Sequence, residues 1–92
     1  MLTIKPLLPT STFEYLNTRT AVYTGEIGQG LSKHEHTFSH IVACLQGKIQ
    51  VVKENKNKVL TVLDAPVLLT ANEWHAVVIC EPNTVFINQM EA

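Results

Sequence analysis

Turn-forming residues divide this chain into segments that are long enough for strands but too short for most helices. Proline, glycine and clusters of polar residues recur at short intervals, and no window of about eleven residues shows the apolar spacing of an amphipathic helix. The chain has 10 valines, 6 isoleucines and 10 threonines among its 92 residues, so more than a quarter of it is β-branched. Such side chains favour extended backbone. These features predict an all-β fold built as a barrel or sandwich.

We expect ten strands in one domain, residues 1–92, and at most a single turn of helix. The segment Glu54–Lys58 is polar and rich in lysine, which favours a solvated hairpin tip, with a basic binding patch as the alternative. Met90–Ala92 is expected to fray. The expected strands are Leu2–Leu7, Glu14–Leu16, Thr20–Glu26, Ser32–His36, His40–Leu45, Lys48–Lys53, Lys58–Leu63, Val67–Thr70, His75–Cys80 and Thr84–Gln89.

Charge and hydrophobicity argue against several classes of partner. The net charge is −1, which gives a nucleic acid no electrostatic attraction. The longest strictly apolar run, Ala76–Cys80, is too short for a membrane span, and Met1–Thr10 has no apolar signal core. Cys44 and Cys80 are too far apart for a CxxC motif. We therefore expect a cytoplasmic protein with reduced, buried thiols, and a single disulfide is the alternative.

The four histidines of the chain predict a metal site. His34, His36 and His40 form an H-x-H-x3-H pattern, and His75 follows 35 residues later. Two residues apart on a strand, His34 and His36 face the same side, and the three residues before His40 allow a turn to a neighbouring strand. Four imidazoles suit a divalent Fe, Mn, Ni, Cu or Zn ion. An exposed histidine-rich strand is the alternative, but it would not need the distant His75.

The same residues resemble the cupins, small β-barrels of the jelly-roll type. The first cupin motif, G-x5-H-x-H-x3,4-E-x6-G, is matched in spacing from Gly28 to Gly47, with His40 where the family most often has glutamate. The second motif, G-x5-P-x-G-x2-H-x3-N, keeps only its spacing and His75. Its other positions hold Asp64, Thr70, Asn72 and Ile79. Asn72 tolerates the left-handed conformation that a glycine there would adopt.

The resemblance implies a small antiparallel jelly-roll (cupin-like) β-barrel with a tetra-histidine metal site. It also implies a homodimer, which we predict to use the amino-terminal strands because pairing would cover exposed edges. The first functional hypothesis is a metal-dependent oxygenase or dioxygenase, with Fe or Mn, acting on a small organic molecule. A non-catalytic metal or ligand binding or sensing module is the second hypothesis, and a Lewis-acid isomerase or cyclase is the third.

Strand parity identifies candidate residues for the substrate pocket. Glu35 and Glu73 have the opposite parity to the histidines, so we expect them to point outward, and no general base stands out. Gly25, Gly28 and Gly30 match no phosphate-binding motif and are interpreted as turn glycines. The pocket candidates in step with the histidines are Phe38, Val42, Cys44, Gln46, Val77 and Ile79, and Tyr23 and Trp74 are candidates for the mouth, the core or a dimer contact. Most are apolar, which predicts a small, mostly hydrophobic ligand.

Overall fold

A computed structural model describes residues 3–54 and 56–91, and this part of the chain contains ten strands and no helix. All ten predicted strands are confirmed as extended segments, with shifts at their ends. In chain order the strands are β1 (Lys5–Pro6), β2 (Ser11–Tyr15), β3 (Thr18–Gly25), β4 (Gln29–His34), β5 (His40–Gln46), β6 (Ile49–Lys53), β7 (Asn57–Leu60), β8 (Val67–Leu69), β9 (His75–Ile79) and β10 (Thr84–Glu91).

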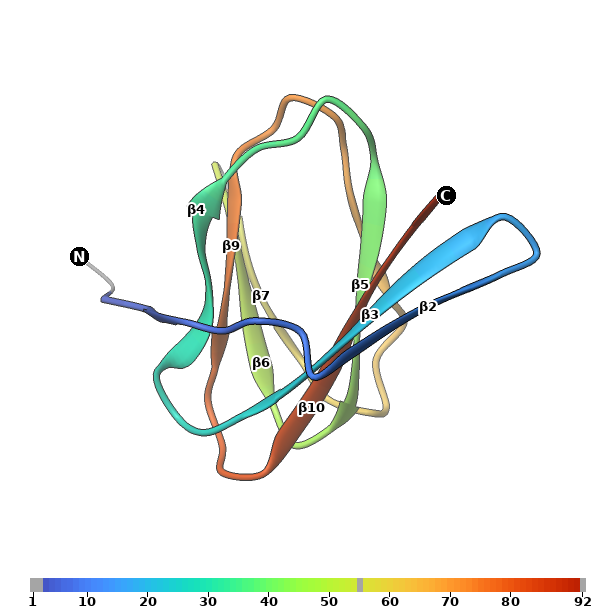
Figure 1. The fold of residues 1–92 in the computed structure, drawn as a ribbon. Helices are drawn as coiled ribbons and strands as arrows, with labels where there is room; N and C mark the ends of the chain where they lie inside the picture. The colour runs from blue at the N-terminus through green and yellow to red at the C-terminus, as the bar shows by residue number, and fades with distance from the viewer. Residues whose placement is uncertain (1–2, 55, 92) are drawn as a thin grey trace.

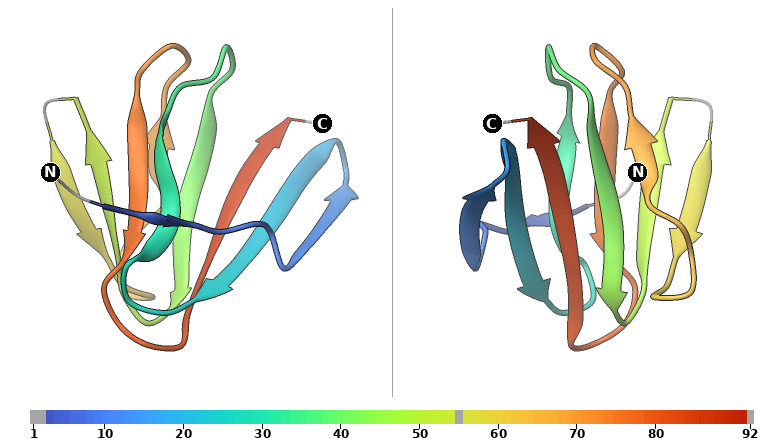
Figure 2. Two further views of the ribbon diagram at one scale, coloured as in Figure 1. Left: turned by 60° about the vertical axis from the view of Figure 1, so that its left-hand side comes forward. Right: turned by 90° about the vertical axis from the view of Figure 1, so that its right-hand side faces the viewer.

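The strands form two five-stranded sheets that face each other (Figures 1 and 2). Sheet A has the order β1-β4-β9-β6-β7, and sheet B has the order β2-β3-β10-β5-β8. All neighbouring strands are antiparallel except β1 and β4, which are parallel. The all-β prediction is confirmed in this two-sheet form. Strand pairing within residues 3–54 and 56–91 does not join the sheets into one continuous barrel.

Two hairpins, β2–β3 and β6–β7, have strand ends that differ from the predicted ones for local reasons. β2 ends at Tyr15 because Leu16 and Asn17 have φ values of 49° and 62°, as the two central residues of a type I′ turn require. The predicted tip at residues 54–58 is confirmed between β6 and β7, but Asn57 already pairs with Val52 and belongs to β7. Residue 55 lies outside the described residues.

The carboxyl-terminal strand is longer than predicted. Met90 and Glu91 pair with Arg19 and Thr18 of β3, so β10 runs to Glu91 and the expectation that Met90 and Glu91 fray is wrong. The reason is the long partner strand, because β3 supplies backbone partners along the whole of β10. Ala92 and the predicted strand residue Leu2 lie outside the described residues.

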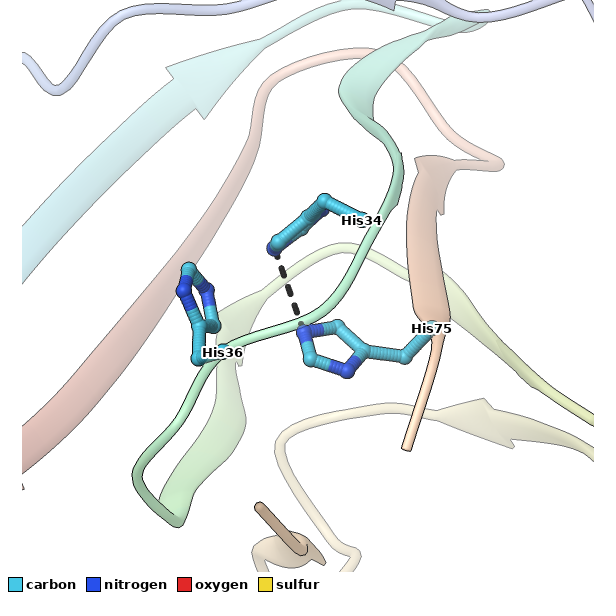
Figure 3. Close-up of side chains that lie close together, drawn as sticks. All are labelled: His34, His36 and His75. Carbon is cyan, nitrogen blue, oxygen red and sulfur yellow. Dashed lines mark hydrogen bonds between the residues drawn. The ribbon is translucent and has the colours of Figure 1, made fainter. Parts of the chain in front are cut away.

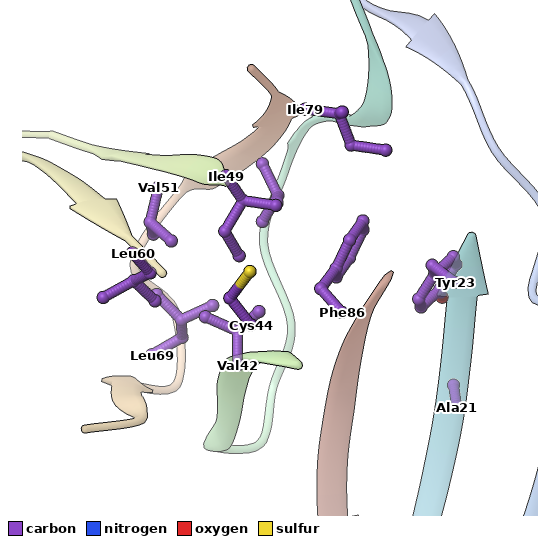
Figure 4. Close-up of a cluster of buried hydrophobic side chains, with 11 residues drawn as sticks. Ala21, Tyr23, Val42, Cys44, Ile49, Val51, Leu60, Leu69, Ile79 and Phe86 are labelled. Carbon is purple, nitrogen blue, oxygen red and sulfur yellow. The ribbon is translucent and has the colours of Figure 1, made fainter. Parts of the chain in front are cut away.

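The core lies between the inner faces of the two sheets (Figure 4). Tyr23 stacks on Phe86 with ring centroids 4.9 Å apart. Both cysteines are free, and burial raises the pKa of each thiol, which keeps the thiols protonated. Within the described ranges, no helix has the length and hydrophobicity that crossing a membrane requires. The core residues are Ala21, Tyr23, Val42, Cys44, Ile49, Val51, Leu60, Leu69, Val77, Ile79 and Phe86.

The turn glycine Gly47 gives a test of the fold. Its φ of +79° is left-handed, and an added Cβ would overlap Thr84 Oγ1 and lie 2.9 Å from Thr84 Cα. Gly28 has a similar φ of +88° but open space around it. We expect Gly28→Ala to lower the free energy of unfolding by about 1–2 kcal/mol through backbone strain. Gly47→Ala should cost about 1–3 kcal/mol more, because Thr84 must move. Urea denaturation of both variants checks this, and equal losses would contradict it.

Candidate metal centre

His34 and His75 are direct cross-strand neighbours at one end of sheet A. His34 is the last residue of β4 and His75 the first of β9, and a register shift between Leu31 and His34 places the two histidines opposite each other. Their Nε2 atoms are 3.1 Å apart, and their ring centroids are 4.4 Å apart (Figure 3). A local irregularity in one pair of strands therefore brings together residues that are 41 positions apart in the sequence.

His36 reaches the same point from outside the strand. The predicted strand Ser32–His36 is too long, because β4 ends at His34 and the next residues cross from sheet A to sheet B. His36 nevertheless faces the other two histidines, as Figure 3 shows. The candidate ligand atoms of His34, His36 and His75 all lie within 4.8 Å of one another. Their convergence is the feature that a shared ion requires.

His40 comes from the opposite sheet. It is the first residue of β5, which pairs with β10 and β8, so the expectation that a turn carries it to a strand next to β4 is wrong. Its ring centroid is 5.0 Å from that of His36 and 4.9 Å from that of His75. His40 is only 3% exposed, and within residues 3–54 and 56–91 neither of its ring nitrogens has a hydrogen-bond partner. The four predicted histidines thus gather between the sheets, although the His40 ligand atom lies outside the closest group of three.

Backbone carbonyls orient two of the imidazoles. His34 Nδ1 contacts the Ser32 carbonyl oxygen, and His75 Nδ1 lies 3.1 Å from the Glu73 carbonyl oxygen. A carbonyl only accepts, so each Nδ1 carries the proton in the neutral ring and each Nε2 presents a lone pair. Two lone pairs facing each other at 3.1 Å need a positive charge to bridge them. Two ligands of one ion, about 2.0–2.1 Å from each nitrogen, would satisfy them.

Burial favours the neutral form of three of the imidazoles, those of His36, His40 and His75. Burial, together with the other histidines, lowers the pKa of His40 and of His75 to about 4 from the usual 6.5. Burial and the neighbouring His34 also lower the pKa of His36. A metal ligates the neutral ring, so these shifts keep the donors available at neutral pH. The unpartnered nitrogens of His40, the facing Nε2 atoms and the all-imidazole donor set therefore fit a transition-metal ion.

The predicted pocket residues fall into different environments. Phe38 is exposed and stacks on the His36 ring at 4.8 Å, which places it at the site. Gln46 lies at the far end of β5 from His40, where its amide donates to the Asn83 carbonyl. Trp74 is half-buried, with the Lys33 ammonium 4.4 Å from its ring centroid. The others, Val42, Cys44, Val77, Ile79 and Tyr23, are packed in the core.

Sequence reasoning missed two polar residues next to the cluster. Lys53 is the cross-strand partner of His75 on β6, and Asn88 on β10 pairs with Val42, two residues from His40. The Asn88 Oδ1 atom is buried and has no hydrogen-bond partner in the described part of the chain. On β6, Lys53 follows the inward-facing residues Ile49 and Val51 at the same two-residue spacing. On β10, Asn88 follows Thr84 and Phe86 in the same way. A polar side chain at an inward position was the signal available in the sequence.

The fold belongs to a known class of β protein. The sequence matches no protein-family model and no curated protein. The structure, however, is similar to solved structures of the cupin superfamily, so the chain has the cupin fold that the motif spacing predicted. The histidines of the first motif and the histidine of the second converge in that fold, and the cluster is able to hold a metal ion.

Three solved structures illustrate the similarity. A cupin superfamily protein from Desulfitobacterium hafniense has a TM-score of 0.77 and 14% identity over 92% of this chain and 76% of its own. A cupin 2 domain-containing protein from Halorhodospira halophila also has a TM-score of 0.77, with 22% identity over 88% of this chain and 61% of its own. KdgF from a Halomonas species has a TM-score of 0.76 and 17% identity over 86% and 73% of the two chains.

The lowered histidine pKa values predict acid sensitivity of the metal-free protein. His40 and His75 titrate at about 4 when folded and near 6.5 when unfolded, so the unfolded chain binds more protons between these values. Their contribution to stability is complete above pH 6.5 and is lost as the pH falls towards 4. Each group adds a slope of up to about 1.4 kcal/mol per pH unit.

Urea denaturation of metal-free protein at several pH values from 7 to 4.5 measures this slope. The variant His40→Leu removes one of the two groups whose pKa is lowered to about 4, while all carboxylates remain. Its stability should fall less steeply with decreasing pH than that of the unsubstituted protein. Parallel curves for the two proteins would contradict the assignment.

Proposed function

We propose that this chain binds one divalent transition-metal ion through His34, His36, His40 and His75, and that the ion holds a small organic molecule for reaction. The observation that carries the proposal is the pair of Nε2 atoms facing each other at 3.1 Å, with His36 and the unpartnered His40 beside them. Buried imidazoles without partners would otherwise cost several kcal/mol.

The donor set restricts the ion and its chemistry. Imidazole nitrogen suits Fe, Mn, Ni, Cu or Zn, whereas Mg and Ca prefer oxygen. With Fe or Mn the centre would supply oxygenase chemistry, and as a Lewis acid it would supply isomerisation or cyclisation. Glu35 is exposed, and the Glu73 carboxylate is occupied by Thr70 and Lys53, so we assign no side chain as a general base. The histidines would hold the ion, with His40 and His75 buried between the sheets and His34 and His36 partly exposed.

The surroundings indicate the kind of molecule that would bind. Phe38 stacks beside His36, and Val42 and Val77 are in the apolar core between the sheets. Asn88 adds one buried acceptor oxygen without a partner. We therefore propose a small, mostly apolar ligand that carries a hydrogen-bond donor for Asn88. The non-catalytic binding module remains the second candidate, because no acid or base is assigned.

Metal analysis tests the proposed centre. Protein purified without an affinity tag should contain one transition-metal ion per chain, and His36→Ala and His75→Ala should each lower the metal affinity at least about 100-fold, since each removes a ligand. Gln46→Ala, at the far end of β5, is the control and should keep the metal. Stoichiometric metal in both histidine variants would overturn the proposal.

Metal identity and oxygen uptake separate the functional candidates. Bound Fe or Mn, with oxygen consumption in the presence of a candidate substrate, would support the oxygenase. Tight zinc with ligand binding and no turnover would support the binding module. Isomerised or cyclised product without oxygen uptake would support the Lewis-acid enzyme.

We also propose a homodimer formed through the outer face of sheet B. Each of the five strands places at least one apolar side chain on this face, and the amino-terminal strand β2 contributes Phe13 and Tyr15. Polar residues of β3 and β10, Thr18, Thr20, Thr24 and Gln89, lie between them. Phe13 and Leu68 are each 54% exposed. The apolar residues of the face are Phe13, Tyr15, Val22, Ile41, Ala43, Leu68, Val85 and Ile87. An antiparallel sheet exposed to water on one face normally alternates apolar and polar residues, so this face is suited to burial.

The size and charge of the face favour a second copy as the occupant. Five strands about 4.8 Å apart and about 20 Å long cover roughly 500 Å² before side-chain relief is added. This area approaches the about 600 Å² per partner at the lower end of the range for stable interfaces. Among the described strand residues that face outward here, Glu91 at the end of β10 is the one charged side chain, so most of the face can meet a second copy without charge repulsion. A groove of about 300 Å³ between Phe13, Tyr15 and Gln89 offers a recess for a partner side chain.

Light scattering coupled to gel filtration tests the dimer. The protein should have twice the mass of the 10.2 kDa chain. Phe13→Lys combined with Leu68→Lys should give a monomer, because both exposed sites would bury charge in the interface. Val59→Lys, on the exposed side of β7 in sheet A, is the matched control and should remain dimeric. A monomer for the unsubstituted chain, or a dimer for the double variant, would contradict the proposal.

A further inference from the structure

One short turn makes three hydrogen bonds at the histidine cluster, two to histidines and one to Ser39. The turn at residues 70–73 joins β8 in sheet B to β9 in sheet A and lies beside the segment that carries His36 (Figure 2). The Asn72 amide donates to the His36 carbonyl at 2.6 Å, and the Ala71 amide donates to Ser39 Oγ at 3.1 Å. At the other end of the turn, the Glu73 carbonyl accepts from His75 Nδ1. The position of this turn therefore affects His36, the residue preceding His40, and His75.

Lys53 holds the turn in place from β6. Its ammonium lies 3.3 Å from Glu73 Oε1 and donates to the Leu68 carbonyl at 3.4 Å. The same Glu73 oxygen accepts a hydrogen bond from Thr70 Oγ1 at 3.0 Å. One cation thus joins sheet A, the last part of β8 in sheet B, and both ends of the turn.

This ion pair is more sheltered than a typical surface pair. The Lys53 and Glu73 side chains are 19% and 28% exposed, whereas Lys48 and Glu81, also 3.3 Å apart, are 41% and 47% exposed. A sheltered pair is less screened and better able to fix the geometry of its neighbours. Partners that orient a histidine through its second nitrogen commonly change metal affinity about 10- to 100-fold. The Glu73 carbonyl has that relation to His75.

We infer that Lys53 and Glu73 are positioning residues that hold His75 in the Nδ1-protonated form and present its Nε2 to the metal. The salt bridge fixes the Glu73 side chain, which with Thr70 fixes the turn, and the turn places the Glu73 carbonyl against His75 Nδ1. The expected change in metal affinity rests on the proposed metal-binding function. The expected change in the protonation site of the His75 ring does not rest on it, because the contact between His75 and the Glu73 carbonyl is present without metal.

Two variants and two readouts test this inference. Lys53→Met removes the charge but keeps the length of the side chain, and Glu73→Gln weakens the pair but keeps its shape. Each should raise the dissociation constant for Co²⁺, added alone to metal-free protein, about 10-fold or more. The nitrogen NMR signals of His75 in metal-free protein should shift towards the Nε2-protonated form. Lys48→Met breaks the exposed pair and should change neither readout. Lys53→Arg keeps the positive charge, so its Co²⁺ affinity and His75 signals should be like those of the unsubstituted protein.

The outcomes separate this inference from the proposed function. If His75→Ala loses the metal but Lys53→Met and Glu73→Gln bind Co²⁺ and show His75 signals like the unsubstituted protein, the positioning role is wrong and the metal site stands. If His75→Ala binds Co²⁺ as well as the unsubstituted protein, the metal site is wrong, and the NMR signals alone decide the positioning role. If Lys53→Met does not fold, Glu73→Gln decides the positioning role by the same criteria.

Discussion

The pairing of β4 with β9 is the constraint on which the candidate site depends. Leu31 pairs with Val77, and without a register shift the same antiparallel pairing would place His34 opposite the residue before His75, outside β9. The register shift after Leu31 instead aligns His34 with His75, and two backbone carbonyls then turn the bare nitrogens of both rings towards each other. His36 and His40 are placed by the crossing that follows β4. The pairing thus decides whether the spacing of the histidines along the chain becomes closeness in space.

Patterns that depend on neighbouring residues were predictable from the sequence. β-branched runs between turn residues located the strands. The pattern of the four histidines predicted the metal site, and its resemblance to the cupin motifs implied the cupin fold. Asn72, expected to accept a left-handed conformation in place of a glycine, has a φ of 65°. Gly28 and Gly47, at the two ends of the first motif, also have positive φ values. A positive φ is a local requirement of the backbone, and glycine or asparagine at such a position indicates it in the sequence.

Features that depend on distant pairing were not predictable in the same way. β5 lies in sheet B because it pairs with β10 and β8, which come much later in the chain. The local sequence around His40 therefore could not place this residue on the sheet opposite His34. The extension of β10 to Glu91 depends on the length of β3, more than sixty residues earlier. Lys53 and Asn88 gave a weaker signal, because a polar residue at an inward position becomes meaningful only when its neighbours across the sheets are known.

The distribution of the histidines over both sheets has a consequence for dynamics. His34 and His75 belong to sheet A, His40 begins a strand of sheet B, and no strand pairing within the described chain bridges the sheets. An ion shared by these residues would link the two sheets at the end where the chain crosses from β4 to β5 and from β8 to β9. Binding of the ion would then stabilise the contact between the sheets as well as the site, so local opening at this end should be rarer in the metal-bound protein than in the metal-free protein.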